Sequence, residues 1–257
     1  MTMSQLPTII VPARLESSRL ERKLLYEING KPLIIWTAER IKSEAPNFPL
    51  FFAVDSSELS ECLKSNGFDS ILTGADHQSG TDRIAEANET IGSEWVINIQ
   101  GDEPLIQASQ IQILADSLKE GHSMATLATP FSEVEAFYNP NAVKVVRSLN
   151  GNALYFSRSP IPYARSLQGE VSTDWLLKNH CYKHIGLYGY SAEFLRSIAK
   201  MQRGQLEALE SLEQLRILEN GHSIYVGLSN EKTIGIDTIE DIEDFNTWAK
   251  TQATREL

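Results

Sequence analysis

The chain has few cysteines, no excess of basic residues and no long apolar run. Cys62 and Cys181, its only cysteines, lie far apart and match no disulfide framework or metal-ligand spacing, which favours a reducing compartment. The apolar run from Thr8 to Val11 is far too short for a signal peptide or a membrane span. We therefore expect a protein that stays in the cytoplasm.

Other absences narrow the classes of function. The net charge of −11 argues against a nucleic-acid surface, because duplex binding draws its affinity from clustered lysines and arginines. The P-loop pattern Gly-x-x-x-x-Gly-Lys is missing, which argues against an ordinary ATPase. No internal repeat, low-complexity tract or long linker divides the sequence. We expect one domain over residues 1–257, and the 42% hydrophobic content suffices for its core.

The first half of the chain alternates short apolar or β-branched runs with amphipathic stretches. This pattern is typical of an α/β fold whose mostly parallel sheet is flanked by helices. The expected strands are Thr8–Val11, Leu50–Val54, Trp95–Ile99 and Met124–Ala128. The expected helices are Pro32–Ser43, Ser56–Ser65, Thr81–Ile91 and Ser109–Lys119.

The second half has a different character. From about 139 to 190, short strand-like segments surround a proline-rich loop, which predicts a smaller β-rich lobe. Helical periodicity returns at Leu206–Glu219, and Asn220-Gly221 should end that helix before a strand at Ser223–Val226. The strands expected in the lobe are Ala142–Val146, Ala153–Phe156 and His184–Tyr190.

A local group of basic residues follows the first strand of this acidic chain. In an open α/β sheet, ligands bind beyond the carboxyl ends of the strands, so a triphosphate could be held here. Arginine offers planar bidentate donors to phosphate, and lysine offers a compact charge. A solvated surface loop is the plain alternative. Five basic residues lie within eighteen positions: Arg14, Arg19, Arg22, Lys23 and Lys31.

Two aspartates are candidate ligands for Mg²⁺, a hard cation that prefers oxygen ligands. Asp102 follows the strand expected at Trp95–Ile99, although a Gly-Asp turn can also be purely structural. Asp237 follows a strand-like segment and precedes the last helix, where it could also serve as a helix cap.

The segment from Leu72 to Arg83 is rich in small and hydrogen-bonding residues. Its backbone groups could read the edge of a nucleobase. A plain loop with a helix N-cap at Thr81 is the alternative, and the sequence does not separate the two.

Together these segments closely resemble the 3-deoxy-manno-octulosonate (Kdo) cytidylyltransferases, also called CMP-Kdo synthetases. The matching segments occur in the family's order and span almost the whole chain. They are Pro12-Ala13-Arg14 with Ser17, Arg19 and Lys23; Ala75 to Thr81; Gln100 to Pro104; Asn139 to Lys144; Tyr155 to Pro162; His184 to Tyr190; Leu212 to Arg216; and Asp237-Thr238.

The resemblance implies a nucleotide-diphospho-sugar transferase fold and a homodimer formed largely through the smaller lobe. It also implies transfer of CMP from CTP to the anomeric hydroxyl of Kdo, releasing pyrophosphate and giving CMP-Kdo for lipopolysaccharide synthesis. The implied catalytic residues are Arg14, Lys23, Asp102 and Asp237, the two aspartates as Mg²⁺ ligands. The residues implied at or beside CTP are Arg14, Ser17, Arg19, Lys23, Ala75, Ser79 and Gln100. The residues implied for the sugar are Gln100, Arg158, His184, Tyr188, Glu213 and Gln214.

The chemistry of these residues agrees with that division. Arg158 is a suitable partner for the sugar carboxylate. His184 and Tyr188 would lie on one face if their segment is a strand, because their spacing is even. A bound metal can lower the pKa of the attacking hydroxyl, so no general base is assigned.

One segment departs from the family pattern. Where the family usually reads Leu-Pro-Gly-Lys-Pro-Leu, residues 20–25 read Leu-Glu-Arg-Lys-Leu-Leu. Glycine permits backbone angles that the arginine at position 22 resists, which leads to the hypothesis of a related substrate such as 8-amino-Kdo. The competing hypotheses are a nonulosonate cytidylyltransferase and a non-catalytic nucleotide-binding protein. The presence of both Asp102 and Asp237 favours catalysis.

Overall fold

The computed structural model describes residues 6–17, 20–77, 79–231, 235–236 and 238–253. The chain divides into two compact units. Met1–Ile111 and Thr233–Leu257 form the first, and Gln112–Lys232 forms the second. The expected lobe at about 139–190 lies within the second unit. This division into two compact units does not test whether they form the single domain that the sequence predicts, which stays a prediction.

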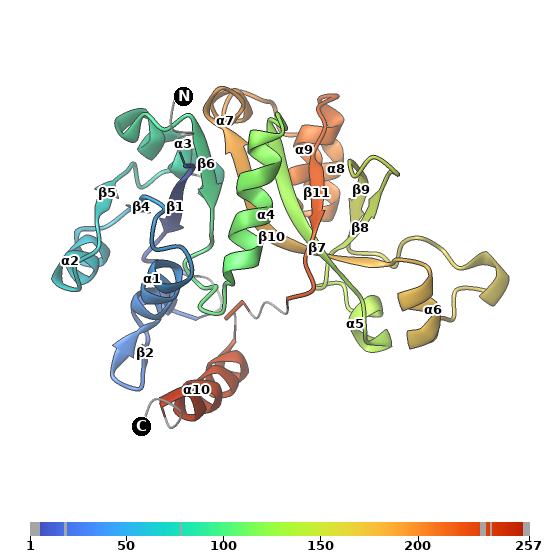
Figure 1. Cartoon of the computed structure of the whole chain (residues 1–257), viewed down its shortest axis with the longest axis horizontal. Coiled ribbons are helices and arrows are strands. Elements are labelled where there is room, and N and C mark those ends of the chain that lie inside the picture. Colours follow the sequence, from blue (N-terminus) through green and yellow to red (C-terminus); the bar gives the residue numbers. More distant parts are fainter. Residues whose placement is uncertain (1–5, 18–19, 78, 232–234, 237, 254–257) are drawn as a thin grey trace. The chain divides into compact units, whose positions relative to one another are not determined.

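A parallel sheet is the centre of the first unit, with its strands in the order β6, β1, β4, β5 (Figure 1). All six residues of β1 are buried, as expected for a strand covered on both faces. Burial of each large apolar side chain contributes about 1.5–3 kcal/mol. The strands are β1 (Thr8–Ala13), β4 (Leu50–Val54), β5 (Ser70–Leu72) and β6 (Trp95–Asn98).

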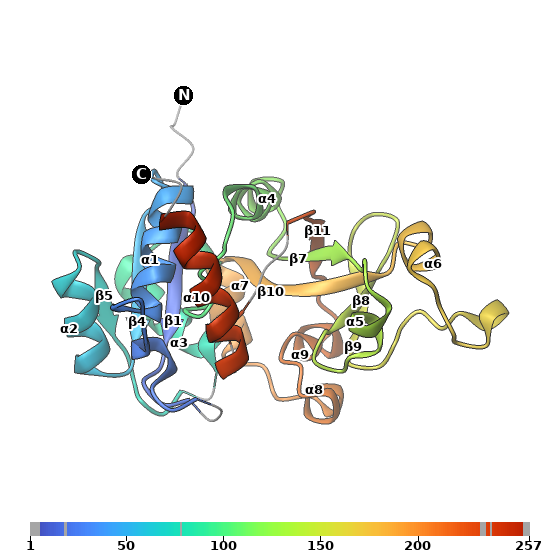
Figure 2. The ribbon, with the colours of Figure 1, turned by 90° about the horizontal axis from the view of Figure 1, so that it is seen from below.

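Helices connect these strands. The ring of Trp36 meets that of Phe245 edge to face, with centroids 5.6 Å apart, so α10 packs beside α1 (Figure 2). Between β1 and α1 lie the 3-10 helix η1 (Lys23–Leu25) and the hairpin of β2 (Glu27–Ile28) and β3 (Lys31–Pro32). The helices of this unit are α1 (Leu33–Glu44), α2 (Ser57–Ser65), α3 (Gly80–Ile91) and α10 (Ile239–Ala253).

The second unit is built on a mixed sheet. Strand β7 (Met124–Pro130) pairs parallel with β11 (Tyr225–Leu228) and antiparallel with β10 (Tyr182–Ser191). Strand β8 (Lys144–Arg147) pairs antiparallel with both β10 and β9 (Ala153–Ser157). The predicted α/β class, with a mostly parallel mixed sheet flanked by helices, is confirmed.

The helices of the second unit are mostly short. The division between the units falls within α4 (Ala108–Lys119). The others are α5 (Val134–Tyr138), η2 (Arg165–Leu167), α6 (Thr173–Lys178), α7 (Ala192–Ile198), α8 (Gln205–Glu210) and α9 (Gln214–Glu219). Among the described residues, no helix is long and apolar enough to cross a membrane.

The single helix predicted at Leu206–Glu219 is wrong, because the structure has two helices there. Ser211 separates them in a left-handed conformation with φ of 52°. The preceding Glu210 is the last residue of α8, and its carboxylate accepts hydrogen bonds from Ser157 Oγ (2.6 Å) and Arg158 N (2.9 Å). A tertiary contact therefore ends α8, which helical periodicity does not reveal.

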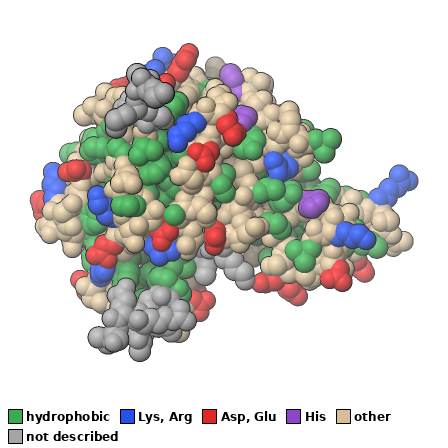
Figure 3. Space-filling model, in the orientation of Figure 1, with side chains coloured by type: hydrophobic (Ala, Val, Ile, Leu, Met, Phe, Trp, Pro, Cys, Tyr) green, Lys and Arg blue, Asp and Glu red, His purple; other side chains and the backbone are tan. Residues whose placement is uncertain are grey.

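The described surface mixes charges of both signs. Basic and acidic side chains are interspersed with apolar ones on the face that Figure 3 shows. The whole chain has 34 acidic and 23 basic residues, and residues of both kinds are visible on this face.

Thr37 links α1 to the turn after β6, which gives a first test. Its buried hydroxyl lies 2.9 Å from the carbonyl oxygen of Gly101. Thr37→Val should lower the free energy of unfolding by about 1–2 kcal/mol, because the carbonyl loses its donor. Urea unfolding measures this. The control is Thr247→Val, since that exposed hydroxyl bonds the Glu243 carbonyl within α10. Equal losses in both variants would contradict the anchoring role of Thr37.

Candidate active site

Polar residues follow the strands of the first unit, all at one edge of its sheet. Parallel neighbours end on the same side, and this edge is where ligands bind in open α/β sheets. The residues are Arg14 after β1, Asp55 after β4, Thr73 after β5, and Gln100 and Asp102 after β6.

The loop after β1 is anchored at its backbone. The N–H of Leu15 donates to Asp55 Oδ1 at 2.9 Å. Arg14 is exposed and Ser17 is partly buried, so both remain accessible to a ligand. Arg19 lies outside the described residues. The predicted contacts of these residues with CTP remain predictions.

Lys23 and Asp102 are direct neighbours in the structure. Lys23 Nζ lies 2.5 Å from Asp102 Oδ2, and the two side chains are 10% and 26% exposed. A Cβ at Gly101 would come within 3.3 Å of Leu24, so glycine allows this close approach of the turn to η1. The predicted triphosphate lysine and the predicted metal aspartate thus lie together.

Arg22 occupies the position where the family pattern has glycine, and it adopts a left-handed conformation with φ 54° and ψ 34°. A non-glycine residue in this region costs about 1–2 kcal/mol. The guanidinium of Arg22 pairs with Glu58 of α2. The chain therefore keeps a backbone conformation that glycine favours, and Lys23 reaches Asp102 without the glycine.

Asp102 is one of the two residues that the sequence predicts as ligands of Mg²⁺. Asp237, the second predicted ligand, lies outside the described residues, but the N–H of the preceding Ile236 donates to the Asp102 carbonyl at 3.0 Å. Among the described residues, no group of three or more His, Cys, Asp or Glu could hold a metal. Mg²⁺ at nucleotide sites usually takes one or two carboxylates together with phosphate oxygens. Two carboxylates, the number predicted from the sequence with Asp102 and Asp237, would meet that requirement, and metal binding stays a prediction.

Two other residues predicted beside CTP are accessible. Ala75 is exposed, and Gln100 is partly buried with its Nε2 donating to Asn98 Oδ1 at 3.3 Å. Their roles remain predictions.

The alternative N-cap at Thr81 is wrong, because α3 begins at Gly80 and Ser79 is its N-cap. Ser79 Oγ accepts the N–H of Asp82 at 3.1 Å and lies 2.9 Å from the Asp82 carboxylate. The Ser79 hydroxyl thus caps α3, and the predicted contact between Ser79 and CTP stays a prediction.

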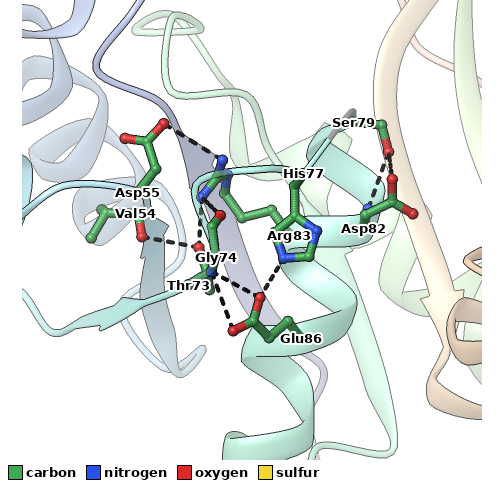
Figure 4. A network of polar contacts seen from close by, with 9 residues as sticks. All are labelled: Val54, Asp55, Thr73, Gly74, His77, Ser79, Asp82, Arg83 and Glu86. Atoms are coloured by element: carbon green, nitrogen blue, oxygen red, sulfur yellow. Dashed lines mark hydrogen bonds and ion pairs between the residues drawn. The ribbon is translucent and has the colours of Figure 1, made fainter.

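The loop between β5 and α3 is held by a network of side chains (Figure 4). Arg83 Nη1 donates to Thr73 Oγ1 at 2.6 Å and to the Gly74 carbonyl at 3.2 Å. Glu86 accepts the N–H of Gly74 and pairs with His77. The hydrogen bond from His77, followed by that from Gly74, lowers the pKa of the Glu86 carboxyl. The described residues Thr73, Gly74 and His77 of the segment proposed to read a base are therefore held by side chains of α3.

In the second unit, Arg158 is held by backbone carbonyls. Its Nε donates to Glu210 O at 2.7 Å, Nη1 to Pro140 O at 3.1 Å and Nη2 to Ser211 O at 3.3 Å. A guanidinium has five N–H donors, so these contacts leave two for a carboxylate. The geometry is compatible with the predicted role of Arg158.

Lys144, to which the sequence assigned no role, supports the same region. It is fully buried, and its Nζ donates to Asn139 O at 2.7 Å and to Arg158 O at 2.9 Å. Burial lowers the pKa of Lys144 and the charge of Arg158 adds to this, while Glu210 opposes it. Lys144 therefore orders the loop and the strand end that carry Arg158.

His184 and Tyr188 lie side by side on β10, with ring centroids 5.6 Å apart. Residues four apart in a regular strand are separated by about 13 Å. The short distance arises from a bulge, because the pairing with β7 shifts between Ile185 and Tyr188. The bulge thus brings the two rings closer together than their even spacing in a regular strand would.

The hydrogen bonds of Thr126 determine the tautomer of His184. Thr126 Oγ1 lies 2.8 Å from Leu187 O, 3.2 Å from Ile185 O and 2.9 Å from His184 Nε2. Carbonyls only accept, so the Thr126 proton serves a carbonyl and His184 Nε2 donates. Nδ1 is then an acceptor. Burial also lowers the pKa of His184 to about 3, which keeps the ring neutral at working pH.

Tyr188 and Glu213 are electrostatically coupled. Burial raises the pKa of the Tyr188 phenol, and the negative charge of Glu213 raises it further. Tyr188 therefore remains a neutral hydrogen-bond donor. Glu213 is the N-cap residue of α9, and the buried Gln214 is its first residue. Three of the predicted sugar residues, His184, Tyr188 and Glu213, thus interact within the second unit.

The sequence model of a family described as cytidylyltransferase matches residues 8–227. The chain belongs to this cytidylyltransferase family. It is 43% identical over 241 residues to the 3-deoxy-manno-octulosonate cytidylyltransferase of Parabacteroides distasonis, covering 91% of this chain and 94% of that one. It is 44% identical over 243 residues to the enzyme of the same name from Thermodesulfovibrio yellowstonii, again covering 91% and 94%. The resemblance inferred from the motifs is confirmed.

Solved structures give the same picture. A CMP:2-keto-3-deoxy-manno-octonic acid synthetase complexed with CTP has a TM-score of 0.87 and 33% identity, covering 96% of this chain and 100% of that one. A putative glucose-1-phosphate thymidylyltransferase from Bacillus anthracis has a TM-score of 0.63 at 13% identity, covering 94% of each chain, and shows a shared fold only. The predicted nucleotidyltransferase fold and enzyme class are confirmed.

Several residues of this cytidylyltransferase received no role from the sequence. Asp55 and Thr73 each follow a strand, which is the one sequence signal that could have found them, and Arg83 ends the polar segment that begins at Leu72. Thr126 and Lys144 could not be found this way, because their roles depend on partners distant in sequence.

The His184 pKa predicts a pH-dependent stability. The unfolded side chain takes up a proton near pH 6.5 and the folded one only near pH 3, so stability falls as pH drops through this window. Between pH 7 and pH 5 the wild type should lose about 2 kcal/mol more than His184→Gln.

Urea unfolding at both pH values measures this difference. His222→Gln, which changes an exposed histidine after α9, serves as the control and should behave as the wild type. The assignment fails if His184→Gln keeps the full pH dependence.

Proposed function

We propose that the protein transfers CMP from CTP to the anomeric hydroxyl of Kdo, releasing pyrophosphate and CMP-Kdo. Relatives named for this activity, 43% and 44% identical over about nine-tenths of both chains, support the proposal. The likeness to a synthetase complexed with CTP supports it as well. The observation within this chain that carries it is the neighbouring pair Lys23 and Asp102 at the ligand-binding edge of a parallel sheet.

The first unit would bind CTP and its cation. Arg14, Lys23 and Ser17 provide a charged and polar loop for the triphosphate. Asp102, with the predicted Asp237, would hold Mg²⁺, which supplies positive charge at the phosphate oxygens when bound. Lys23 would hold a phosphate oxygen and Asp102 would hold the cation, so the two side chains that pair with each other in this structure would each keep a partner of opposite charge.

The second unit would bind the acidic sugar. Arg158 has two N–H groups for the carboxylate. His184 Nδ1 can accept a hydrogen bond from one sugar hydroxyl, and the Tyr188 hydroxyl can donate a hydrogen bond to another. His184 is too weak a base to remove the hydroxyl proton, because burial lowers its pKa to about 3. Catalysis then depends on positioning and on charge neutralisation at the phosphates, as is usual for phosphoryl-type transfer. Gln100, Glu213 and Gln214 remain predicted sugar residues.

The test is release of pyrophosphate from CTP with Mg²⁺ and Kdo. Asp102→Asn keeps the shape of the side chain and removes its charge, so kcat should fall by about 10²–10³-fold, the range seen when one electrostatic group is removed from an active site. Asp116→Asn, at an exposed position on α4, is the matched control and should keep wild-type kcat. Equal activity of the two variants would contradict the role of Asp102.

A panel of sugars separates the candidate substrates. We expect turnover of Kdo and poor turnover of 8-amino-Kdo and sialic acid, because the relatives compared above carry the Kdo name. Faster turnover of 8-amino-Kdo or sialic acid than of Kdo would show that the faster sugar, and not Kdo, is the substrate. No release with any sugar would support a non-catalytic nucleotide-binding protein.

We also propose that the protein forms a homodimer and acts in the cytoplasm. The second unit has an apolar groove of about 600 Å³, lined in part by Val134, Tyr138, Tyr163 and Val171, which could support a contact between copies. Tyr163 is 69% exposed there. The cytoplasmic location is supported by two free cysteines, of which Cys181 is buried with its pKa raised by burial to about 11.

Charge in this groove should disrupt a dimer. Tyr163→Glu should shift the mass measured by light scattering from dimer to monomer, because a buried carboxylate without a partner is costly. Leu149→Glu is the control, since this fully exposed apolar residue follows β8 and does not line the groove. A wild type that is monomeric at all concentrations would overturn the predicted dimer.

A further inference from the structure

One ion pair, Asp55 with Arg83, joins two loops of the first unit. Asp55 follows β4, and Arg83 reaches toward it from α3 (Figure 4). Arg83 Nη2 lies 3.5 Å from Asp55 Oδ2, and the side chains of Arg83 and Asp55 are only 5% and 15% exposed. Neither residue belongs to the predicted CTP, metal or sugar residues.

Asp55 connects the pair to the loop after β1. Its second carboxylate oxygen, Oδ1, accepts the backbone N–H of Leu15 at 2.9 Å. Leu15 directly follows Arg14 and lies two residues before Ser17, the residues proposed to bind the triphosphate. The orientation of the Asp55 carboxylate therefore sets the position of this loop.

Arg83 connects the pair to the loop after β5. It donates to Thr73 Oγ1 (2.6 Å) and to Gly74 O (3.2 Å), and the Thr73 hydroxyl lies 2.9 Å from Val54 O. Gly74 precedes Ala75, which is proposed to lie beside the nucleotide. A planar guanidinium can hold the hydroxyl, the carbonyl and the carboxylate at once, which a lysine ammonium does less well.

The burial of these charges requires a reason. A buried ion pair often stabilises a fold no better than apolar residues of similar size, because desolvation offsets the attraction. What Asp55 and Arg83 offer beyond an apolar contact is direction, since Asp55 Oδ1 holds the backbone N–H of Leu15 while Arg83 Nη1 holds the backbone carbonyl of Gly74. The pair thus defines the spacing of two loops rather than merely filling space.

We propose that Asp55 and Arg83 are positioning residues that hold the loops around Arg14–Ser17 and Gly74–His77 in register, so that both contact one CTP molecule. The inference rests on the proposed function. It extends that function by naming residues that do not touch the substrate and by predicting that a change on one loop reaches the other.

The test compares steady-state kinetics of Arg83→Gln and the wild type with CTP, Mg²⁺ and Kdo. We expect KM for CTP to rise by about 10- to 100-fold, because a displacement of about 1 Å in a positioning group has effects of this size. KM for Kdo should change less than twofold. Arg40→Gln is the matched control and should leave both KM values unchanged, since Arg40 pairs with Glu44 and bonds Ile106 O in the same unit, away from both loops.

Two further variants separate positioning from general stability. Arg83→Lys keeps the charge beside Asp55 and should recover part of the CTP affinity. Thr73→Val removes the hydroxyl that accepts from Arg83 and lies 2.9 Å from Val54 O, so it should raise KM for CTP at a cost in stability like that of Thr37→Val. It keeps the Arg83 charge, which covers the case in which Arg83→Gln does not fold. Amide hydrogen exchange supplies a readout without catalysis, since Arg83→Gln or Thr73→Val should speed exchange at Leu15 on the other loop.

The outcomes are distinct. If the wild type releases no pyrophosphate, the proposed function fails, whereas the exchange at Leu15 still tests the coupling. The positioning role is overturned if the wild type is active and the Arg83 and Thr73 variants match Arg40→Gln in KM for CTP. It is also overturned if Leu15 exchanges at the wild-type rate in both variants, or if KM for Kdo rises as much as KM for CTP.

Discussion

The parallel pairing of β1 with β4 and β6 is the constraint on which the candidate nucleotide site depends. Because these strands run in one direction, the loops that follow them meet at one edge of the sheet. Leu15 can then bond Asp55, and Lys23 can reach Asp102. The strand order thus brings together Leu15 and Asp55, which are 40 residues apart in the sequence, and Lys23 and Asp102, which are 79 residues apart. The charged groups only refine an arrangement that the sheet already imposes.

The second unit achieves proximity by an irregularity instead. The bulge in β10 brings two rings together that a regular strand would hold apart, and the hydroxyl of Thr126 lies against the carbonyls of that bulge. The same hydroxyl determines which nitrogen of His184 accepts a hydrogen bond. One local defect in a strand thereby creates both the spacing and the hydrogen-bonding character of these side chains.

Much of the fold could be predicted from the sequence, because buried parallel strands read as apolar runs and helices as periodic ones. The continuous helix at 206–219 was wrong, since a carboxylate of Glu210 bonds to a strand remote in sequence. The motifs found the Lys23 and Asp102 segments but not their ion pair. Arg22 shows a second reason why the sequence does not predict every detail. Arginine disfavours left-handed backbone angles, but Arg22 adopts them in this structure. Pairwise contacts of this kind carry no local sequence signal.

The central claim is that this chain joins CMP to Kdo. The most direct measurement is ³¹P NMR of the protein with CTP, Mg²⁺ and Kdo. The account predicts that the triphosphate signals disappear while pyrophosphate and a CMP phosphodiester form in equal amounts, and only when the sugar is present. Unchanged CTP, or cleavage of CTP to the same extent without the sugar, would contradict it.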